Sequence, residues 1–216
     1  MEPLANNAAS IRLPDGPRLA GASVEELFDA SGALLRGHFV LKSGRHSDRY
    51  LEKFAVLQYP VLAVEIGRRL ALALADRDPT LVVGPTTGGA LLAFETARQL
   101  EQMLGHTVRG VFAEPVERGA RALRRGRPVR DTDRVVLVDD ILTTGASLAE
   151  TVSAVRAAGA VPLAAAVIVD RSTGPVKIGC PIVSLGQIEI DSWAAAECPA
   201  CGRGESPVKP GSSAPS

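Results

Sequence analysis

The sequence predicts an α/β fold with a central, mainly parallel sheet flanked by helices and a small N-terminal hood. Three observations predict this fold class. Short apolar runs alternate with segments of helical periodicity through the middle of the chain, an order typical of parallel sheets wound by right-handed crossovers. The apolar content is 46% with only 4% aromatic residues, so the core must be built from Ala, Val, Leu and Ile. Strands of a parallel sheet that is covered on both faces are rich in such aliphatic residues. The length of 216 residues is sufficient to bury that core.

The beginning of the chain does not follow the strand–helix alternation. Residues 1–20, rich in Ala, Asn and Pro, predict a flexible leader. The segment Ser23-Val24-Glu25-Glu26 is a capping box and predicts a helix start. The apolar side chains of Leu27, Leu34 and Leu35 predict that this helix continues beyond residue 30.

A hairpin-like segment is expected next. After a break at Gly37, Phe39-Val40-Leu41 predicts a short strand, and the polar run Lys42–Ser47 predicts a turn. The mixed segment Tyr50–Leu57 is expected to be extended. Residues 21–58 therefore predict the hood.

The following part of the chain predicts the sheet and its helices. Pro60 is placed as the first residue of a helix, and others are expected to end near Leu104 and to run from Leu148 to near Gly159. Five apolar runs predict strands: Leu81–Gly84, Val108–Ala113, Val135–Val138, Leu163–Val169 and Ile182–Leu185. Together with the hood, this domain is expected to span residues 21–192.

Charge and cysteine usage exclude several classes of protein. Lys+Arg and Asp+Glu both number 24, so the net charge predicts no binding to nucleic acid or to an anionic membrane. No apolar run reaches the length of a membrane span, and no basic-then-apolar signal pattern opens the chain. Three cysteines do not make a secreted disulfide framework, so a cytoplasmic protein is predicted.

The segment from Val135 to Ser147 is the most informative motif. Its apolar run ends in Asp139 and Asp140, and a Thr/Gly/Ser turn then leads into a helix. That order places hydroxyls and backbone N–H groups at a helix N-terminus, where anions bind. The two carboxylates stand at the carboxyl end of a strand, where open α/β sheets bind ligands. A ribose 5-phosphate satisfies both features. The alternative is a surface turn in which the acids are solvated and Thr143 or Thr144 caps the helix.

This motif resembles the 5-phosphoribosyl 1-diphosphate (PRPP) signature of the type I phosphoribosyltransferases, an apolar strand, two acids and a T-[TA]-G-x-[ST] loop. The resemblance implies the type I phosphoribosyltransferase fold, with Asp140 as a catalytic residue. It also implies that PRPP or its acceptor is bound by Asp139, Asp140, Ile141, Leu142, Thr143, Thr144, Gly145, Ala146 and Ser147. Mg²⁺ is the implied cofactor, held near the two aspartates by substrate and water with no direct protein ligand.

A basic segment, Glu114–Arg130, precedes this strand, where phosphoribosyltransferases carry a mobile catalytic loop. Arginines on a closing loop would stabilise the charge of departing diphosphate and exclude water, so Arg118 and Arg121 are expected to be catalytic. The family's usual loop lysines and histidine are absent here. A solvated basic loop or an incidental nucleic-acid patch is the alternative.

The turn Gly84-Pro85-Thr86-Thr87-Gly88-Gly89 resembles the family's diphosphate-binding loop, since small residues let the backbone approach a diphosphate. Bacterial orotate enzymes often carry Lys at the place of Gly88. By itself the segment is equally typical of an ordinary strand-to-helix turn.

Two further segments resemble the orotate phosphoribosyltransferases. Phe39–Arg45 is similar to their F-x-L-x-S-G segment, which implies that Lys42 reaches the substrates. Asp170-Arg171 is similar to their D-R pair, in which the arginine faces orotate; an ordinary strand-end charge pair is the alternative.

The resemblance covers residues 34–190 and implies a glycosyltransferase that converts orotate and PRPP to orotidine 5-phosphate and diphosphate in de novo pyrimidine biosynthesis. It also implies a homodimer. Two other hypotheses remain: a phosphoribosyltransferase for another base, and a non-catalytic PRPP-binding regulator on the same fold. The altered catalytic loop keeps the second of these open.

The chain from Trp193 onward predicts a loop-like tail, residues 193–216, with a disordered end at Gly211–Ser216. It contains a CxxC motif, Cys198 and Cys201, which is half of a zinc site. The other candidate ligands lie far upstream or alone: His38, His46, His106 and Cys180. A reduced structural tail and a site completed across a dimer are the alternatives; a redox motif is disfavoured because this CxxC is not expected to open a helix after a strand.

Overall fold

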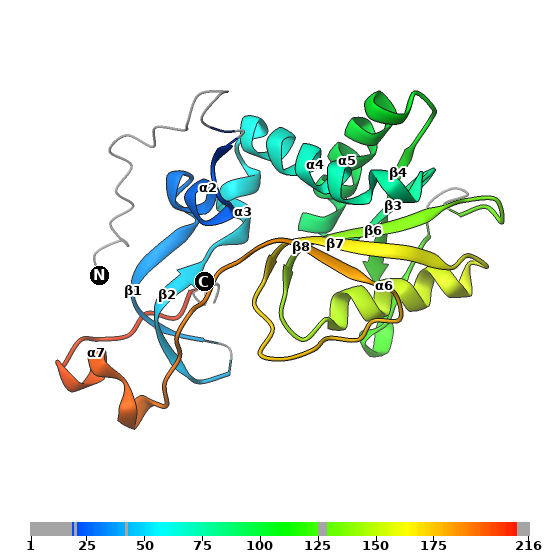
Figure 1. Cartoon of the computed structure of the whole chain (residues 1–216). Helices are drawn as coiled ribbons and strands as arrows, with labels where there is room; N and C mark the ends of the chain where they lie inside the picture. Colours follow the sequence, from blue (N-terminus) through cyan, green and yellow to red (C-terminus); the bar gives the residue numbers. More distant parts are fainter. Residues whose placement is uncertain (1–18, 20, 42, 125–128, 211–216) are drawn as a thin grey trace. The chain divides into compact units, whose positions relative to one another are not determined.

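The structure is a computed structural model that describes residues 19, 21–41, 43–124 and 129–210 (Figure 1). The predicted leader (except Leu19 itself), Lys42 and the predicted disordered end lie outside these residues. The chain divides into two compact units, Leu57–Ile188 and a smaller one that combines Met1–Val56 with Glu189–Ser216. The tail that the sequence sets apart from the hood therefore belongs to the same unit as the hood.

The larger unit is built on a six-stranded sheet of order β5-β4-β3-β6-β7-β8. Its parallel strands are β3 (Leu81–Pro85), β4 (Arg109–Pro115), β6 (Val135–Leu142), β7 (Pro162–Asp170) and β8 (Ile182–Gln187). The two-residue strand β5 (Arg121–Ala122) pairs antiparallel with β4 at the edge. The five predicted strands and their parallel arrangement are confirmed.

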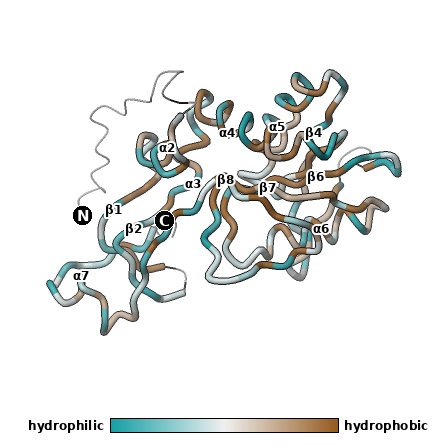
Figure 2. Tube along the Cα trace, in the orientation of Figure 1, coloured by the Kyte–Doolittle hydropathy of each residue, from teal (hydrophilic) through white to brown (hydrophobic). Residues whose placement is uncertain are grey.

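Helices cover both faces of this sheet. The helices are α4 (Pro60–Leu74), α5 (Gly88–Leu104) and α6 (Ala146–Ala157), and α4 and α5 lie on the face opposite to α6 (Figure 1). Because both faces are covered, the central strands β3, β6 and β7 are buried along almost their whole length. β6 and β7 are drawn mainly as hydrophobic segments (Figure 2).

Side chains alternate between the two faces along each strand. Leu137 packs with Leu148 and Val152 of α6, and Val135 packs with Val155 of the same helix. Val135 and Leu137 of β6 therefore face α6, as Leu142 at the end of the strand also does, and the intervening Val136 and Val138 face the α4/α5 layer.

The strand order reverses between β3 and β6. From β3 the chain crosses through α5 to β4 on one side, whereas from β6 it crosses through α6 to β7 on the other. This topological switch point is where doubly wound sheets bind ligands, beyond the carboxyl ends of the strands.

At the opposite, amino-terminal edge, Asp133 joins the starts of three strands. Its carboxylate accepts hydrogen bonds from Thr80 Oγ1 (3.2 Å), from the Arg109 guanidinium and from the Arg130 backbone N–H (2.6 Å). Burial acts to raise the pKa of Asp133, but the hydrogen bonds from Arg109 and Arg130 outweigh it and hold that pKa below its ordinary value.

The smaller unit contains helix α2 (Val24–Ala30) and an antiparallel hairpin of β1 (Leu34–Val40) and β2 (His46–Leu51). The one-turn helix α3 (Lys53–Leu57) leads into the larger unit, and the returning tail forms η3 (Ala195–Glu197) and α7 (Pro199–Gly202).

The tail pairs with both strands of the hairpin. His46 and Trp193 exchange two backbone hydrogen bonds of 2.9 Å each. Val208 N–H donates to His38 O (2.7 Å) and Val208 O accepts from Val40 N–H (2.8 Å). The residues before and after the CxxC motif are thus bound to the hairpin by main-chain contacts.

Two predictions for this unit are wrong. Leu34 and Leu35 begin β1 rather than continue the first helix, because that helix ends at Ser31 and Gly32 follows with φ 69°, a left-handed conformation that terminates helices. Residues 53–57 are helical rather than extended.

We predict that Asp133→Asn destabilises the protein by about 1–3 kcal/mol at neutral pH, because a buried, charge-assisted network is disrupted. The wild-type contribution is present above the ordinary carboxyl pKa and is lost as the pH falls through the lower folded-state pKa. The difference between variant and wild type should therefore shrink below about pH 4. Chemical denaturation across pH measures it.

The control is Asp76→Asn, since the side chain of Asp76 is 66% exposed. We expect no change in stability there. A difference for Asp133→Asn that stays constant down to pH 3 would contradict the assignment of this stabilisation to the ionised carboxylate.

Candidate active site

The two aspartates at the end of β6 point to opposite faces of the sheet. Both are buried, with 7% of Asp139 and 3% of Asp140 exposed. Asp139 Oδ1 accepts the Asp140 backbone N–H (2.8 Å), and Asp140 Oδ1 accepts the Ile141 N–H (2.7 Å). Because neighbours on a strand alternate, Asp139 lies on the α6 side and lines the loop pocket, whereas Asp140 lies on the α5 side next to Gly88.

The turn after β6 leads directly into α6, as predicted. Thr143 and Thr144 are exposed, and Thr144 Oγ1 accepts the Ala146 backbone N–H (3.4 Å). A small pocket of about 60 Å³ forms around the turn and is lined by Asp139, Ile141, Leu142, Thr143, Thr144, Gly145, Ala146, Ser147 and Leu148. The first-turn N–H groups of α6 and the hydroxyls of this turn make the pocket suited to an anion.

Both the backbone conformation at position 145 and the close approach of neighbouring side chains require a glycine there. It begins α6 with φ 76° and ψ 7°, a left-handed conformation that favours glycine. A Cβ at this position would also collide with Val176 Cγ1 and lie 3.2 Å from Ile178 Cγ2. The loop that follows β7 therefore fixes the shape of the turn.

The β3–α5 turn lies beside the β6 turn, since β3 and β6 are paired. It contains a cis peptide bond between Thr86 and Thr87. A Cβ on Gly84 would collide with Gly89 O, and one on Gly88 would collide with Asp140 Oδ2. This clash with Asp140 gives a physical reason for glycine at position 88.

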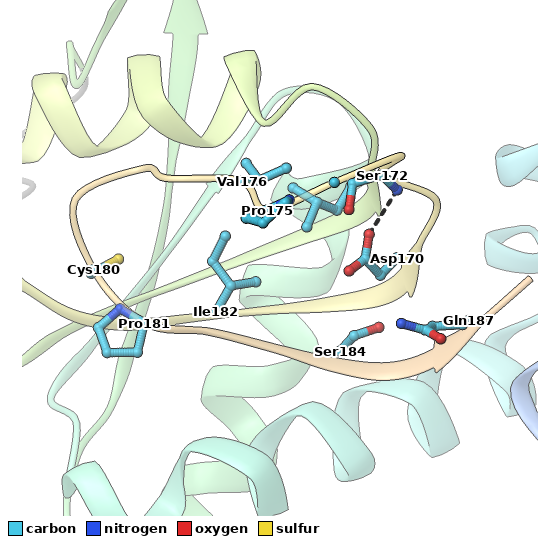
Figure 3. A pocket seen from close by; sticks show the side chains of 11 residues that line it. Asp170, Ser172, Pro175, Val176, Cys180, Pro181, Ile182, Ser184 and Gln187 are labelled. Atoms are coloured by element: carbon cyan, nitrogen blue, oxygen red, sulfur yellow. Dashed lines mark hydrogen bonds between the residues drawn. The ribbon is translucent and has the colours of Figure 1, made fainter.

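A larger pocket of about 530 Å³ adjoins the small one, and Leu142 lines both. Its wall comes from the end of β7, the following loop and β8 (Figure 3). Sequence reasoning missed its polar lining residues, Ser172, Ser184 and Gln187. Gln187 could have been found from the sequence, because it lies at the carboxyl end of the last strand, β8, and ligands bind at this edge of such sheets.

Arg171 follows β7 at the same edge of the sheet. Its backbone N–H donates to Leu142 O (2.8 Å), which ties it to the end of β6. The preceding Asp170 accepts the Ser172 N–H (2.8 Å; Figure 3). The structure thus brings the predicted D-R pair to the switch-point edge that carries the PRPP-type motif.

The basic segment is more regular than the sequence predicts. Strand β4 continues to Pro115, and β5 pairs back onto it. Arg121 lies in β5 with its side chain 12% exposed, 3.3 Å from Glu150 Oε2 of α6 and donating to Ala113 O (3.2 Å). The segment around Arg121 is thus ordered in this structure, with the side chain ion-paired to Glu150 of α6.

Two other predicted site residues, Arg118 and Lys42, are not fully described by the structure. The Arg118 backbone belongs to the short helical turn Glu117–Gly119, and its side chain lies outside what the structure describes. Arg125, Arg127 and Lys42 lie outside the described residues altogether.

Comparison with known proteins identifies the family of this chain. The family model for the phosphoribosyl transferase domain matches residues 59–200. The chain belongs to the phosphoribosyltransferase family.

Relatives of this chain within the family include orotate phosphoribosyltransferases. The chain is 42% identical to the orotate phosphoribosyltransferase of Pelotomaculum thermopropionicum over 186 residues, covering 86% of this chain and 94% of the relative. It is also 42% identical to that of Heliobacterium modesticaldum over 191 residues, covering 88% and 96%. The predicted resemblance to orotate phosphoribosyltransferases is confirmed.

Solved structures share the fold. The crystal structure of Mycobacterium tuberculosis H37Rv orotate phosphoribosyltransferase in complex with inorganic phosphate aligns with a TM-score of 0.62 at 25% identity, covering 80% of this chain and 96% of that one. The type I fold predicted from the motifs is confirmed. Across the described residues, none of the helices combines the length and apolar character needed to cross a membrane.

We predict that Gly145→Ala is more destabilising than Gly105→Ala. The two glycines have nearly the same φ, +76° and +73°, but a Cβ at Gly105 meets no atom within 4 Å. Gly105→Ala should cost about 1–2 kcal/mol from the left-handed backbone alone. Gly145→Ala should cost about 1–3 kcal/mol more, because Val176 and Ile178 must move. Denaturant unfolding measures both, and equal losses would contradict the steric role of the loop after β7.

Proposed function

We propose that this chain transfers the 5-phosphoribosyl group of PRPP to orotate, giving orotidine 5-phosphate and diphosphate in pyrimidine biosynthesis. The observation that supports it most is the acid pair followed by the anion-binding turn at the switch point. The sequence identity to orotate phosphoribosyltransferases over nearly their whole length supports orotate as the base.

The turn Thr144–Ser147 binds the 5-phosphate in this proposal. Backbone N–H groups at the start of α6 and two hydroxyl side chains donate to the phosphate oxygens, and the helix dipole favours their negative charge. The ribose then extends toward Asp139 and Asp140, whose carboxylates accept hydrogen bonds from its 2- and 3-hydroxyls.

The donor set at the aspartates fits Mg²⁺ carried by the substrate. The carboxylates of Asp139 and Asp140 would lie near the ion, and among the described residues they belong to no cluster of three or more His, Cys, Asp or Glu side chains. Substrate oxygens and water would hold the ion, with no direct protein ligand. When bound, Mg²⁺ supplies positive charge that neutralises the diphosphate leaving group.

The reaction breaks the bond between C1 of the ribose and the diphosphate oxygen and forms a bond from C1 to a ring nitrogen of the base. The proton of that nitrogen is released and can be taken up by the departing diphosphate. As the C–O bond breaks, the ribose ring gains positive charge, which the buried carboxylate of Asp140 stabilises. Arg118 and Arg121 stabilise the departing diphosphate; for this, Arg121 exchanges its Glu150 partner for the leaving group.

Arg171 and Lys42 select the base in this proposal. A guanidinium group can donate two parallel hydrogen bonds to the orotate carboxylate, which uracil lacks. The position of Arg171, tied to Leu142 at the carboxyl edge, supports this role.

We predict that the purified protein consumes orotate in the presence of PRPP and Mg²⁺, and leaves uracil, adenine and hypoxanthine unchanged. Absorbance or chromatography of each base measures it. Turnover of another base with orotate untouched would reject orotate as substrate, and no turnover with retained PRPP binding would favour the regulator hypothesis.

We further predict that Asp140→Asn lowers kcat on the order of 10²-fold or more while the fold is retained, because a charge-stabilising group is lost from the reaction centre. Asp76→Asn, at an exposed aspartate, is the control and should keep wild-type kcat. Circular dichroism checks the fold. Undiminished turnover would remove Asp140 from the catalytic role.

A homodimer is the second part of the proposal. Large apolar side chains are exposed along α4 and α5, which lie side by side (Figure 1). They are Val61, Val64 and Leu72 of α4 and Leu91 and Phe94 of α5. Burial of such a patch against a second copy would remove it from water. A cytoplasmic location, in keeping with the cysteine usage, is part of the same proposal.

Phe94→Asp is predicted to convert the dimer to a monomer at micromolar concentration, because a charge would be buried in the contact. Val161→Asp is the matched control: Phe94 is 70% and Val161 68% exposed, but Val161 lies in the α6–β7 turn. Light scattering after size exclusion measures the mass. A monomeric wild type, or a Phe94→Asp variant that stays dimeric, would contradict this interface.

A further inference from the structure

The smaller unit brings together four side chains that can bind metal: His38, His46, Cys198 and Cys201. Their ligand atoms all lie within 4.8 Å of one another. His38, His46 and Cys198 are buried, and Cys201 is half-buried. The sequence showed only half a site, because the histidines are about 150 residues upstream of the CxxC motif.

Three nitrogen–sulfur separations within the cluster match one tetrahedral centre. Cys198 Sγ lies 3.4 Å from His38 Nε2, and Cys201 Sγ lies 3.6 Å from His38 Nε2 and 3.3 Å from His46 Nδ1. Zn–N bonds of about 2.0–2.1 Å and Zn–S bonds of about 2.3 Å place such atoms about 3.3–3.8 Å apart. The two imidazole nitrogens, 2.7 Å apart, would separate slightly around a metal.

The orientation of His38 favours metal binding over a simple hydrogen-bond cluster. Its other ring nitrogen, Nδ1, lies 2.8 Å from the Glu205 carbonyl oxygen. A carbonyl can only accept, so Nδ1 carries a proton, and the Nε2 lone pair of the neutral imidazole is directed at the cluster. Histidines that bind zinc usually donate their other ring N–H to a group such as a backbone carbonyl, which fixes the orientation of the ring.

We propose that His38, His46, Cys198 and Cys201 bind one Zn²⁺ in a closed, structural site that holds the tail on the hairpin. Two thiolates and two imidazoles in a tetrahedral set suit zinc, and four protein ligands leave no position open for catalysis. All four ligands come from one chain, so a site completed across a dimer is not required. Cys180 lies in the larger unit and takes no part.

The main chain already supports this site. His46 is bonded to Trp193, and His38 to Val208, on either side of the CxxC motif. Cys198 caps α7, so the motif opens a short helical turn where the sequence predicted a loop. The metal would cross-link the hairpin to the middle of a tail segment whose two ends are held by hydrogen bonds.

The decisive measurement is the zinc content of the reduced protein, purified without chelator and analysed by mass spectrometry of the metal. About one zinc per chain is expected. Cys198→Ser and His38→Gln should lose most of it, whereas Cys180→Ser and His106→Gln, matched changes outside the cluster, should retain it. Equal zinc in all four variants would overturn the proposal.

A second measurement needs no variant and therefore does not depend on whether a variant folds. Chelator-treated, reduced wild-type protein is titrated with Co²⁺, and the intense visible bands of tetrahedral cobalt with thiolate ligands are followed. Protease cleavage within residues 189–210 should increase after chelation and be reversed by Zn²⁺.

Absence of zinc in the purified protein together with no cobalt spectrum, or a Cys198–Cys201 disulfide in the native protein, would overturn the proposal. None of these readouts depends on PRPP or orotate, so the outcome is independent of the catalytic proposal.

Discussion

The parallel pairing of β3 with β6 is the constraint on which the candidate active site depends. It places two strand-to-helix turns side by side, one made of small residues and one of hydroxyls and backbone N–H groups. The two-residue period of β6 then sends Asp139 to one face and Asp140 to the other, so that each carboxylate meets a different turn. Gly88 lies close to Asp140 because of this geometry. A shift of β6 by one residue would exchange the two carboxylates and destroy the arrangement.

The sequence was sufficient to predict the parts of the fold that local chemistry decides. The apolar run before Asp139 had to be a doubly covered strand, and the turn after it had to begin a helix, because both signals lie within a few residues. The same local reasoning failed at Leu34 and Leu35, where apolar spacing fitted a helix face as well as a strand. The local signal that separates the two is Gly32, whose left-handed conformation after Ser31 ends the helix.

Other features depend on contacts between distant parts of the chain and could not be predicted. Arg121 reads as a free cation of a basic loop, but its partner Glu150 comes from the helix after the next strand. His38 and His46 look like isolated residues of a hairpin until the tail returns to pair with it. The residue types were visible in the sequence in each case, whereas their proximity is decided by how the edges of a sheet or a hairpin are completed.

The discontinuous composition of the smaller unit has a consequence for biosynthesis. Residues 57–188 form a unit that is complete as soon as its own stretch has left the ribosome, but the hairpin made before it must wait for residues 189–208. Its exposed strands are therefore without their tail partner for most of translation, and closing so long a loop is slow. In the interval the nascent hairpin edges are open to pairing with other chains. Chaperone dependence of this protein should accordingly concentrate on the β1–β2 hairpin.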